Sequence, residues 1–572
     1  MDAMGRRVFM GSLAGVGVAA SSSAQGLKDQ RGHAFGKGQP GASPQSGEPQ
    51  RDPSAAAIFN VRDYGATGKK ADDAGPAIHK AIEACAAAGG GVVYLPPGEY
   101  TSGTIHLRSH IRFHVEGGAT LFASKDPQAY DVKESNDSAA LFYGVGLENI
   151  TIEGRGTVDG QHEFIWIKQP EDFERAYGHL LMMKNLGKST MRSFPVGFPD
   201  RQVYPHLVWL FHCTDVHVTG LSFFRAPSWT FYLKECDRVV VDGIYIYTSL
   251  KDAVWCDGID IDGCKDVRIS NCTIETGDDC IAIFAAKRLA ENITITNCRF
   301  SSASAAIKFT EGVAVGARNT VIDNCVITNC NRGITLQIEA GGTIEDVVIS
   351  NMTIELHRYD WFWAGDANPF NFMIGTPSEW NHEPPKPTDP GPGLIRNVII
   401  RDIIAHVQGS SRIAGHHTRP LDGVTFENIK LFISTDPKAP YDTSVHALKF
   451  EHAKNLKVKN VEVIWDKPAL DKWESALYFE NVDGLEIDDF TGRQAWPDQD
   501  APAVVLNKVT DARVVNCKAA EGTKVFLGVI GEGSRDIRLA GNDLVKAKVP
   551  YKFEEGAKKD ELKSLSNFLP ST

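Results

Sequence analysis

Three aspartates that are close together in the sequence carry the strongest chemical signal of this chain. Asp257 lies in the segment CDGID, and Asp278 and Asp279 follow about 21 residues later in the segment GDDC. Two carboxyl groups roughly 6.5 to 9.5 Å apart can hydrolyse a glycosidic bond, one as general acid and the other by activating a water. Crowding also splits the pKa values of carboxyl groups, which keeps one of them protonated. We predict that these three residues form a hydrolytic site, and we interpret the nearby Asp262 as a turn residue.

A repeated pattern of four residues predicts how the acids are held. The pattern is a polar residue or Gly, an apolar residue, a variable residue and then an aliphatic residue or Phe. Its last positions are Val218, Val241, Ile269, Ile295, Ile322, Ile349, Ile400, Phe426, Val458, Ile487, Val514 and Leu539. Short strands and turns that return at such intervals are typical of a parallel β-helix. Stacked coils lie about 4.8 Å apart, so Asp257 and Asp278, one coil apart, can act on the same substrate atom.

Two further registers stay in phase with this repeat. Two residues after its last apolar position stand Asn271, Asn297, Asn324, Asn351, Asn428, Asn460 and Asn516. Asn tolerates the left-handed backbone of a tight turn, and stacked Asn side chains can bond to one another. The next position holds Cys272, Cys298, Cys325, Met352, Ile429 and Cys517, which we predict to face the core. The chain has eleven cysteines; a disulfide between Cys325 and Cys330 stays open.

The ends and interruptions of the repeat predict a single domain over residues 57–572. A helical pattern over Asp72–Ala88 and another over Gly556–Leu569 predict short helices that cap the two ends of the solenoid. Loop insertions are expected near 161–205 and 357–393, where the rhythm breaks. The second insertion carries Trp361, Trp363, Phe370, Phe372 and Trp380, which we expect either to stack on sugar rings or to form a small core of their own.

The N-terminal segment predicts export. Arg6 and Arg7 precede an apolar stretch and small residues, so residues 1–24 are interpreted as a Tat-like signal peptide, and an unprocessed anchor is the alternative. Residues 25–56 have the composition of a flexible linker. We therefore expect a periplasmic or extracellular protein with no membrane contact after processing. The net charge of −12, with cations spread along the chain, argues against a nucleic-acid partner.

The sequence resembles family 28 of the glycoside hydrolases, the polygalacturonase family. The resemblance extends from about Phe59 to Leu539 and includes the segments FNVRDYGA at 59–66, YLPPG at 94–98, Gly154–Gln161 and Asp257–Ile283. It implies an all-β, right-handed parallel β-helix that inverts the anomeric centre and needs no metal or other cofactor. It also implies that Asp279 is the general acid and that Asp257 and Asp278 hold and activate the water.

Several positions depart from the family pattern. Trp255 and Cys256 replace Asn and Thr in the first acidic motif, Ser304 stands where the family has His, and Thr335 and Gln337 stand where it has Arg and Lys. Those cations grip a galacturonate carboxylate in the family. Their loss argues against plain polygalacturonan as the substrate.

The remaining candidate substrate-binding residues come from the same strand phase. Lys308 is either a replacement cation or an ordinary surface lysine, and Trp361, Trp363 and Arg412 are the others, beside Ser304 and Gln337. We expect a polysaccharide or oligosaccharide substrate, pectin-like or related. The alternatives are a β-helix polysaccharide lyase and a carbohydrate-binding β-helix without activity. The sequence leaves the oligomeric state open.

Overall fold

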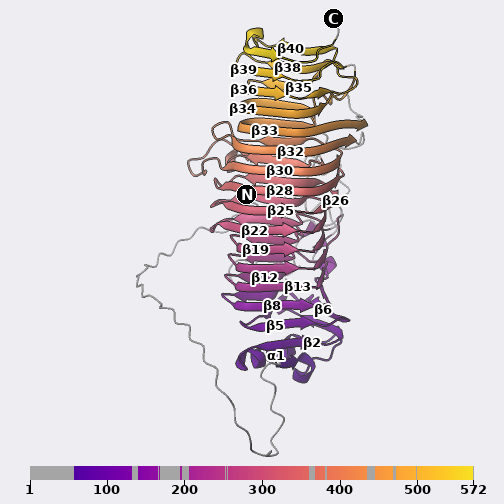
Figure 1. Ribbon diagram of the computed structural model, residues 1–572. Coiled ribbons are helices and arrows are strands. Elements are labelled where there is room, and N and C mark those ends of the chain that lie inside the picture. The colour runs from indigo at the N-terminus through magenta and orange to yellow at the C-terminus, as the bar shows by residue number, and fades with distance from the viewer. Residues whose placement is uncertain are drawn as a thin grey trace, which may run out of the picture.

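The chain folds into a parallel β-helix whose coils stack along one axis (Figure 1). The computed structural model describes residues 57–131, 139–164, 166–167, 194–195, 205–250, 253, 255–359, 367–380, 383–434, 445–467, 472–497 and 499–570. The expected signal peptide, the linker and most of the first insertion lie outside these ranges. Strand pairing between successive coils is parallel throughout the helix, and its crossovers are right-handed, the hand that parallel strand connections adopt.

Three ladders of strands run the length of the helix. The first ladder consists of β4 (Ile105–His106), β7 (Ala140–Val145), β12 (His206–Phe211), β15 (Phe231–Lys234), β18 (Ile259–Asp262), β21 (Ile281–Ala285), β24 (Ala305–Val313), β27 (Arg332–Ile338), β29 (Phe370–Ile374), β31 (Ser411–Ala414), β33 (Leu448–Lys467), β34 (Leu477–Gly492), β35 (Pro502–Asn507), β38 (Val525–Ile530) and β40 (Val549–Glu554). This ladder positions the predicted acids.

The other two ladders complete each coil. The second consists of β1 (Ile58–Asn60), β2 (Gly91–Leu95), β5 (Ile111–Val115), β8 (Glu148–Gly154), β13 (Thr214–Thr219), β16 (Asp237–Asp242), β19 (Lys265–Ser270), β22 (Ala290–Thr296), β25 (Ala317–Asp323), β28 (Thr343–Leu356), β30 (Leu394–Val407), β32 (Leu421–Ser434), parts of β33 and β34, β36 (Thr510–Val515), β39 (Arg535–Ala540) and β41 (Leu562–Leu565). The third consists of β3 (Gly98–Ser102), β6 (Ala119–Ala123), β9 (Thr157–Asp159), β14 (Ser222–Phe224), β17 (Tyr245–Tyr247), β20 (Thr273–Thr276), β23 (Arg299–Ser302), β26 (Val326–Cys330), the ends of the long strands and β37 (Lys518–Ala519).

The predicted Asn register forms the turn between the second and third ladders. All seven residues adopt the left-handed conformation, with φ between +46° and +56°. Within the register, Asn297 Nδ2 donates to Asn271 Oδ1 at 2.5 Å, and Asn324 Nδ2 donates to Asn297 Oδ1 at 3.5 Å. Both parts of the prediction, the backbone conformation and the bonds between coils, are confirmed here.

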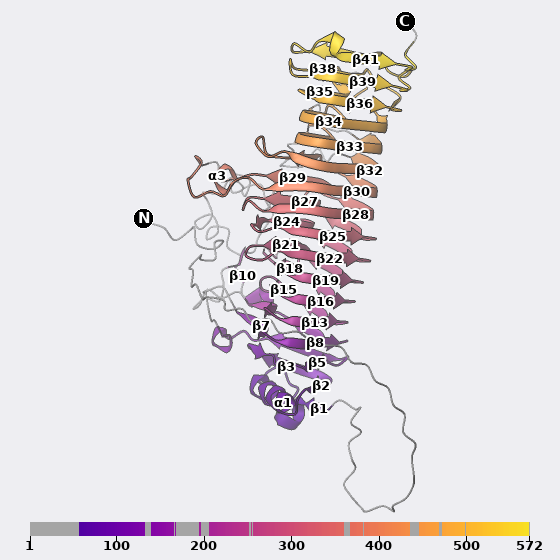
Figure 2. The ribbon, with the colours of Figure 1, turned by 60° about the vertical axis from the view of Figure 1, so that its left-hand side comes forward.

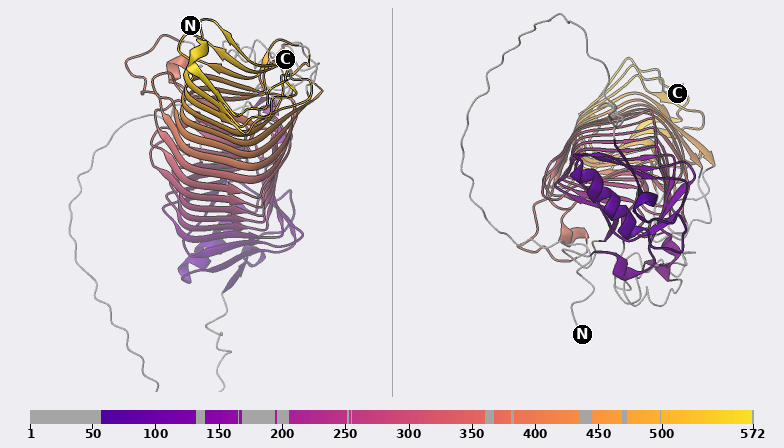
Figure 3. Two further views of the ribbon diagram at one scale, coloured as in Figure 1. Left: turned by 45° about the horizontal axis from the view of Figure 1, so that its top comes forward. Right: turned by 90° about the horizontal axis from the view of Figure 1, so that it is seen from below.

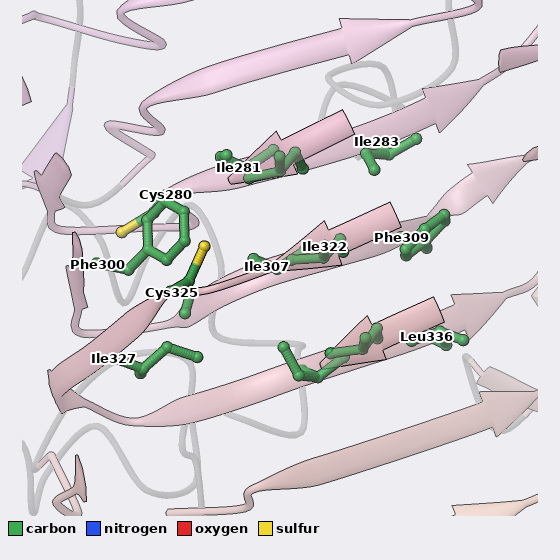
Figure 4. Close-up of a cluster of buried hydrophobic side chains, with 14 of the residues drawn as sticks. Cys280, Ile281, Ile283, Phe300, Ile307, Phe309, Ile322, Cys325, Ile327 and Leu336 are labelled. Atoms are coloured by element: carbon green, nitrogen blue, oxygen red, sulfur yellow. The ribbon is translucent and has the colours of Figure 1, made fainter. Parts of the chain in front are cut away.

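The inside of the coils is one continuous apolar core. Figure 4 shows Cys280, Phe300 and Phe309 packed with the aliphatic side chains of neighbouring coils. The predicted inward-facing residues of the Cys register are all buried. All eleven cysteines are buried free thiols, so Cys325 and Cys330 form no disulfide.

The two ends of the helix differ. At the N-terminal end α1 (Gly75–Ala87) covers the first coil, as the sequence predicts, and buries Ile78, Ala81 and Ile82 (Figure 3). The helix predicted over Gly556–Leu569 is wrong. That segment holds a 3-10 turn, η5 (Lys559–Glu561), followed by β41, which pairs with β39. Its helix-forming composition is overridden because β39 offers an open edge for one more strand.

The second insertion is two excursions separated by a strand of the helix. Phe370 and Phe372, expected within the insertion, lie on β29 and are fully buried in the core beside Phe426. The chain then leaves the coil again and forms α3 (Pro377–Trp380), which projects from the flank beside β29 (Figure 2). Trp380 is 44% exposed, and Trp361 and Trp363 lie outside the described residues.

Smaller elements complete the described chain. They are η1 (Val61–Tyr64), η2 (Pro127–Ala129), η3 (His162–Phe164) and the separate pair β10 (Trp166–Ile167) and β11 (Phe194–Pro195). Within the ranges that the structure describes, no helix is long and apolar enough to span a bilayer.

The Asn register gives a test of the stacking. Asn297→Ala should lower the free energy of unfolding by about 1–2 kcal/mol, because Ala disfavours the left-handed backbone and the side-chain bonds are lost. Asn297→Gly is the control, since Gly keeps the backbone conformation and loses only the bonds. Urea unfolding followed by circular dichroism measures both. Equal losses in the two variants would show that the left-handed turn carries no strain.

Candidate active site

The three predicted acids lie on two successive coils, just before strands of the first ladder. Asp257 precedes β18, and Asp278 and Asp279 precede β21. The two loops are bonded to each other, since the Gly258 amide donates to the Asp279 carbonyl oxygen at 2.9 Å. A Cβ atom on Gly258 would lie 2.3 Å from the Cys280 carbonyl oxygen, so only glycine allows this approach. The loops therefore hold the acids in one place.

A fourth acid joins the cluster. Asp260 lies on β18 and is fully buried, while Asp257, Asp278 and Asp279 are between 3% and 6% exposed. Neither carboxyl oxygen of Asp260 accepts a hydrogen bond from the described residues, and the adjacent acid is Asp257. A proton shared by Asp257 and Asp260 would give each carboxyl group a hydrogen-bond partner.

The crowding changes how the acids titrate. Burial raises the pKa of Asp257 well above its ordinary value, and the charge of Asp260 and then those of Asp278 and Asp279 raise it further. Burial likewise raises the pKa of Asp260, and the charges of Asp279 and Asp278 raise it further. The Lys308 ammonium opposes both shifts. The cluster therefore retains a proton at a pH where isolated carboxyl groups are ionised.

Asp279 is the acid with the most defined contacts. Its Oδ1 accepts hydrogen bonds from Ser304 Oγ at 2.8 Å and from the Ala305 amide at 3.0 Å. Its Oδ2 lies 3.4 Å from Lys308 Nζ. Ser304, predicted to bind substrate, thus donates to Oδ1 of Asp279, while Oδ2 lies beside the Lys308 ammonium.

Lys308 connects Asp279 to a further acid, Glu311, on the next coil. Its side chain is 17% exposed, and Nζ also lies 3.1 Å from Glu311 Oε2. Burial opposes its charge, but Asp279 and Glu311 outweigh burial and hold the pKa of Lys308 above its ordinary value. Burial raises the pKa of Glu311, but Lys308 outweighs this and lowers it. Lys308 is therefore a paired cation within the site, and the alternative of a solvated surface lysine does not fit.

The positions that depart from the family pattern form an uncharged and acidic patch. Thr335 is 1% exposed, and its hydroxyl has no hydrogen-bond partner among the described residues. Gln337 Nε2 donates to Glu339 Oε1 at 2.8 Å. Burial, together with the charge of Glu311, raises the pKa of Glu339 to about 7. No cation stands at these positions, and two glutamates lie close by.

The other predicted substrate-binding residues divide into two groups. Arg412 lies on β31 in the same column as Thr335, two coils further along, and its half-exposed guanidinium pairs with Glu451 at 3.0 Å. It does not contact the acids. Trp361 and Trp363 lie outside the described residues.

Sequence reasoning missed Asp260, Glu311 and Glu339 as members of the site. The strand register shows what could have found the first of them, because Asp260, Ala282 and Lys308 are successive partners along one column. Asp262, interpreted as a turn residue, is instead on β18, where it accepts from the Ala286 amide. Trp255 has a φ of +58°, a backbone conformation that favours Asn and costs a Trp strain.

The buried acid pair predicts an unusual dependence of stability on pH. Because the pKa of Asp260 is raised in the folded state, its contribution to stability is full below the unfolded pKa and is lost as the pH rises. Asp260→Asn should therefore become more stable than the wild type, by a margin that widens from about pH 4 upward. Asp215→Asn is a control of opposite sign, since the hydrogen bond from Arg238 lowers the pKa of Asp215. Urea unfolding across pH 4 to 8 measures the margin, and a constant margin for Asp260→Asn would contradict the assignment.

The chain is similar to known glycosyl hydrolases in sequence and in fold. Residues 85–358 match the model of glycosyl hydrolases family 28. A probable polygalacturonase of Vitis vinifera is 25% identical over 378 residues, which are 61% of this chain and 68% of that protein. Among solved structures, an exopolygalacturonase from Thermotoga maritima has a TM-score of 0.55 at 21% identity, covering 72% of this chain and 93% of the other. The family 28 exopolygalacturonase of Yersinia enterocolitica has a TM-score of 0.56 at 18% identity, covering 76% and 78%. Residues 85–358 thus resemble glycosyl hydrolases family 28, and the protein is an O-glycosyl hydrolase built on a parallel β-helix.

Proposed function

We propose that this protein is an exported glycosidase that cleaves a pectin-like or related polysaccharide with inversion of the anomeric centre. The observation that supports the proposal most directly is the acid cluster at Asp257, Asp278 and Asp279, held on two adjacent coils of a family 28 β-helix. The reaction at these acids requires no metal ion.

Asp279 is proposed as the general acid. Its Oδ1 is fixed by Ser304 Oγ and the Ala305 amide, so the carboxyl plane is held and Oδ2 is the oxygen left to give a proton. The glycosidic oxygen takes that proton as the bond to the sugar carbon breaks. The Lys308 ammonium, 3.4 Å from Oδ2, favours the ionised form of Asp279. Glu311 also pairs with this ammonium and so weakens the attraction between Lys308 and Asp279.

Asp257 and Asp278 are proposed to hold the attacking water. Asp257 lies beside Asp260 on the neighbouring coil, and the raised pKa of both supports the retention of a proton in this part of the site. The water gives its proton to whichever of the Asp257 and Asp278 carboxyl groups is ionised, while its oxygen attacks the sugar carbon on the face opposite to the leaving group. The cluster can return that proton to Asp279 or to solvent for the next turnover.

The substrate is proposed to place an uncharged sugar, and not a bare galacturonate, against β27. A uronate carboxylate there would meet Thr335 and Gln337 in place of cations, with Glu311 and Glu339 close by. The ammonium of Lys308 is already shared by two carboxyl groups. A rhamnogalacturonan or a modified uronide therefore suits the site better than plain polygalacturonan.

Export is proposed from residues 1–24, whose twin arginine and apolar stretch have the pattern of a Tat signal. A Tat route carries folded proteins, and the eleven buried free thiols suit a chain that folds before it meets an oxidising compartment.

The role of Asp279 can be tested by Asp279→Asn. The amide oxygen can still accept from Ser304 and Ala305, so the fold should persist while turnover of a natural glycoside falls roughly 10²-fold or more. Asp262→Asn, which removes an acid from the same ladder without touching the cluster, is the matched control. Reducing-sugar release measures both variants, and full activity in Asp279→Asn would exclude it as the acid.

The stereochemistry of the product tests the water-activating role. Proton NMR during the first minutes of hydrolysis should show the inverted anomer, since Asp257 and Asp278 activate a water and do not attack the sugar. A panel of pectic oligosaccharides provides the substrates. A product of retained configuration rejects the proposed roles, and an unsaturated product absorbing in the ultraviolet identifies a lyase instead.

Substrate choice can be tested by restoring the family's cations. The double variant Thr335→Arg and Gln337→Lys should raise activity on polygalacturonan about tenfold to a hundredfold, since a charge-assisted hydrogen bond contributes roughly 1.5 to 3 kcal/mol. Thr335→Gln with Gln337→Met is a control of similar bulk without charge. High activity of the unmodified protein on polygalacturonan would overturn the substrate proposal.

A further inference from the structure

A group of metal-ligating side chains lies away from the acids, where α3 meets the helix. It consists of Glu379 on α3 and of His416 and His417 in the turn that follows β31. One ligand atom from each residue lies within 4.8 Å of the others. None of the catalytic acids belongs to this group, so its role is separate from the proposed hydrolysis.

The donors suit a transition-metal ion such as Zn²⁺. Two imidazoles and one carboxylate are a common ligand set for zinc, which binds them at about 2.0 to 2.2 Å. Ligand atoms of a tetrahedral zinc site are then about 3.4 Å apart. His416 Nε2 and Glu379 Oε1 are 3.0 Å apart, close to this value. His417 has an exposed side chain, which can rotate to complete the set.

Neighbouring groups hold two of the ligands in place. The Thr418 amide donates to His416 Nδ1 at 3.2 Å, so without a metal the ring proton is on Nε2, which donates to Glu379 Oε1 at 3.0 Å. A metal at Nε2 would displace this proton to Nδ1, where Thr418 Oγ1, 2.7 Å away, can accept it. The Thr376 amide donates to Glu379 Oε2 at 2.9 Å, which leaves Oε1 toward His416. His416 is only 8% exposed, so its ring has little freedom to turn away.

A further histidine stands beside the group on the next coil. The ring of His417 lies 4.0 Å from that of His416 and 6.4 Å from that of His452, measured between centroids. His452 is on β33, which pairs with β31. The group of Glu379, His416 and His417 therefore has a third histidine, from a third segment, beside it on the flank of the helix.

We propose that Glu379, His416 and His417 bind one divalent transition-metal ion of the zinc class, with His452 within reach as a fourth ligand. The ion joins α3, which the chain forms after leaving the coil at β29, to the turn between β31 and β32. A second contact, from Arg419 Nη1 to the Pro392 carbonyl oxygen at 3.1 Å, already joins the same two segments. The metal would fix the excursion against the helix at the margin of the first ladder.

Metal binding by the full protein tests this inference directly. Titration calorimetry with ZnCl₂, after treatment with a chelator, should give one tight site per chain, and Zn²⁺ should raise the melting temperature. Cobalt(II) should give the intense visible absorption of a four-coordinate site with nitrogen ligands. His417→Ala and Glu379→Gln alter exposed side chains, so both should fold, and each should weaken zinc binding by about tenfold or more.

His217→Ala is the matched control, because His217 is an exposed histidine on β13, far along the helix from β31. It should bind zinc as the wild type does. Absence of a stoichiometric site in the wild type would overturn the inference and leave His416 and Glu379 as a simple hydrogen-bonded pair. Equal zinc affinity in His417→Ala and the wild type would overturn it as well.

Discussion

Parallel pairing in register between successive coils is the constraint on which the site depends. Neighbouring strands lie about 4.8 Å apart, so any residue that faces outward on one coil has a fixed partner on the next. Along the first ladder this rule aligns Tyr232, Asp260, Ala282, Lys308 and Thr335. Strand pairing thus brings Asp260 and Lys308 together. The loops before β18 and β21 then place Asp257, Asp278 and Asp279 at the end of that column.

The same constraint explains why the acids remain so close in spite of their charge. A backbone bond from Gly258 to Asp279, and the continuous core beneath both loops, fix the coils at one spacing. The carboxyl groups cannot separate, so burial, and after it the charges of the neighbouring acids, raise the pKa of Asp257 and Asp260. Lys308 and Glu311 extend this charge network into the next coil. The chemistry of the site is therefore a property of the cluster and not of single residues.

The sequence predicts the features that repeat and fails where the repeat is interrupted. The Asn turns and the inward Cys positions follow from a strict period, because each coil must present the same face to the core. Phe370 and Phe372 were assigned to an insertion because extra residues before them change the spacing of the repeat, although β29 continues the first ladder. The C-terminal helix failed because pairing with β39 outweighs local propensity. Glu311 and Glu339 were missed because bulges and loop lengths, which set their positions, leave no periodic signal.

The departures at Ser304, Thr335 and Gln337 are best understood together. The family that the sequence resembles carries His, Arg and Lys at these positions, and its Arg and Lys favour an anionic sugar. Here Ser304 donates to Asp279, Gln337 donates to Glu339, and the buried Thr335 hydroxyl has no partner in the part of the chain that the structure describes. A buried polar atom without a partner costs free energy unless a ligand supplies one. A sugar hydroxyl placed over β27 would satisfy Thr335, and a carboxylate, which can only accept, would also have to approach Glu311 and Glu339. The charges of Glu311 and Glu339 thus support the proposed class of substrate, one whose sugar at this point is neutral.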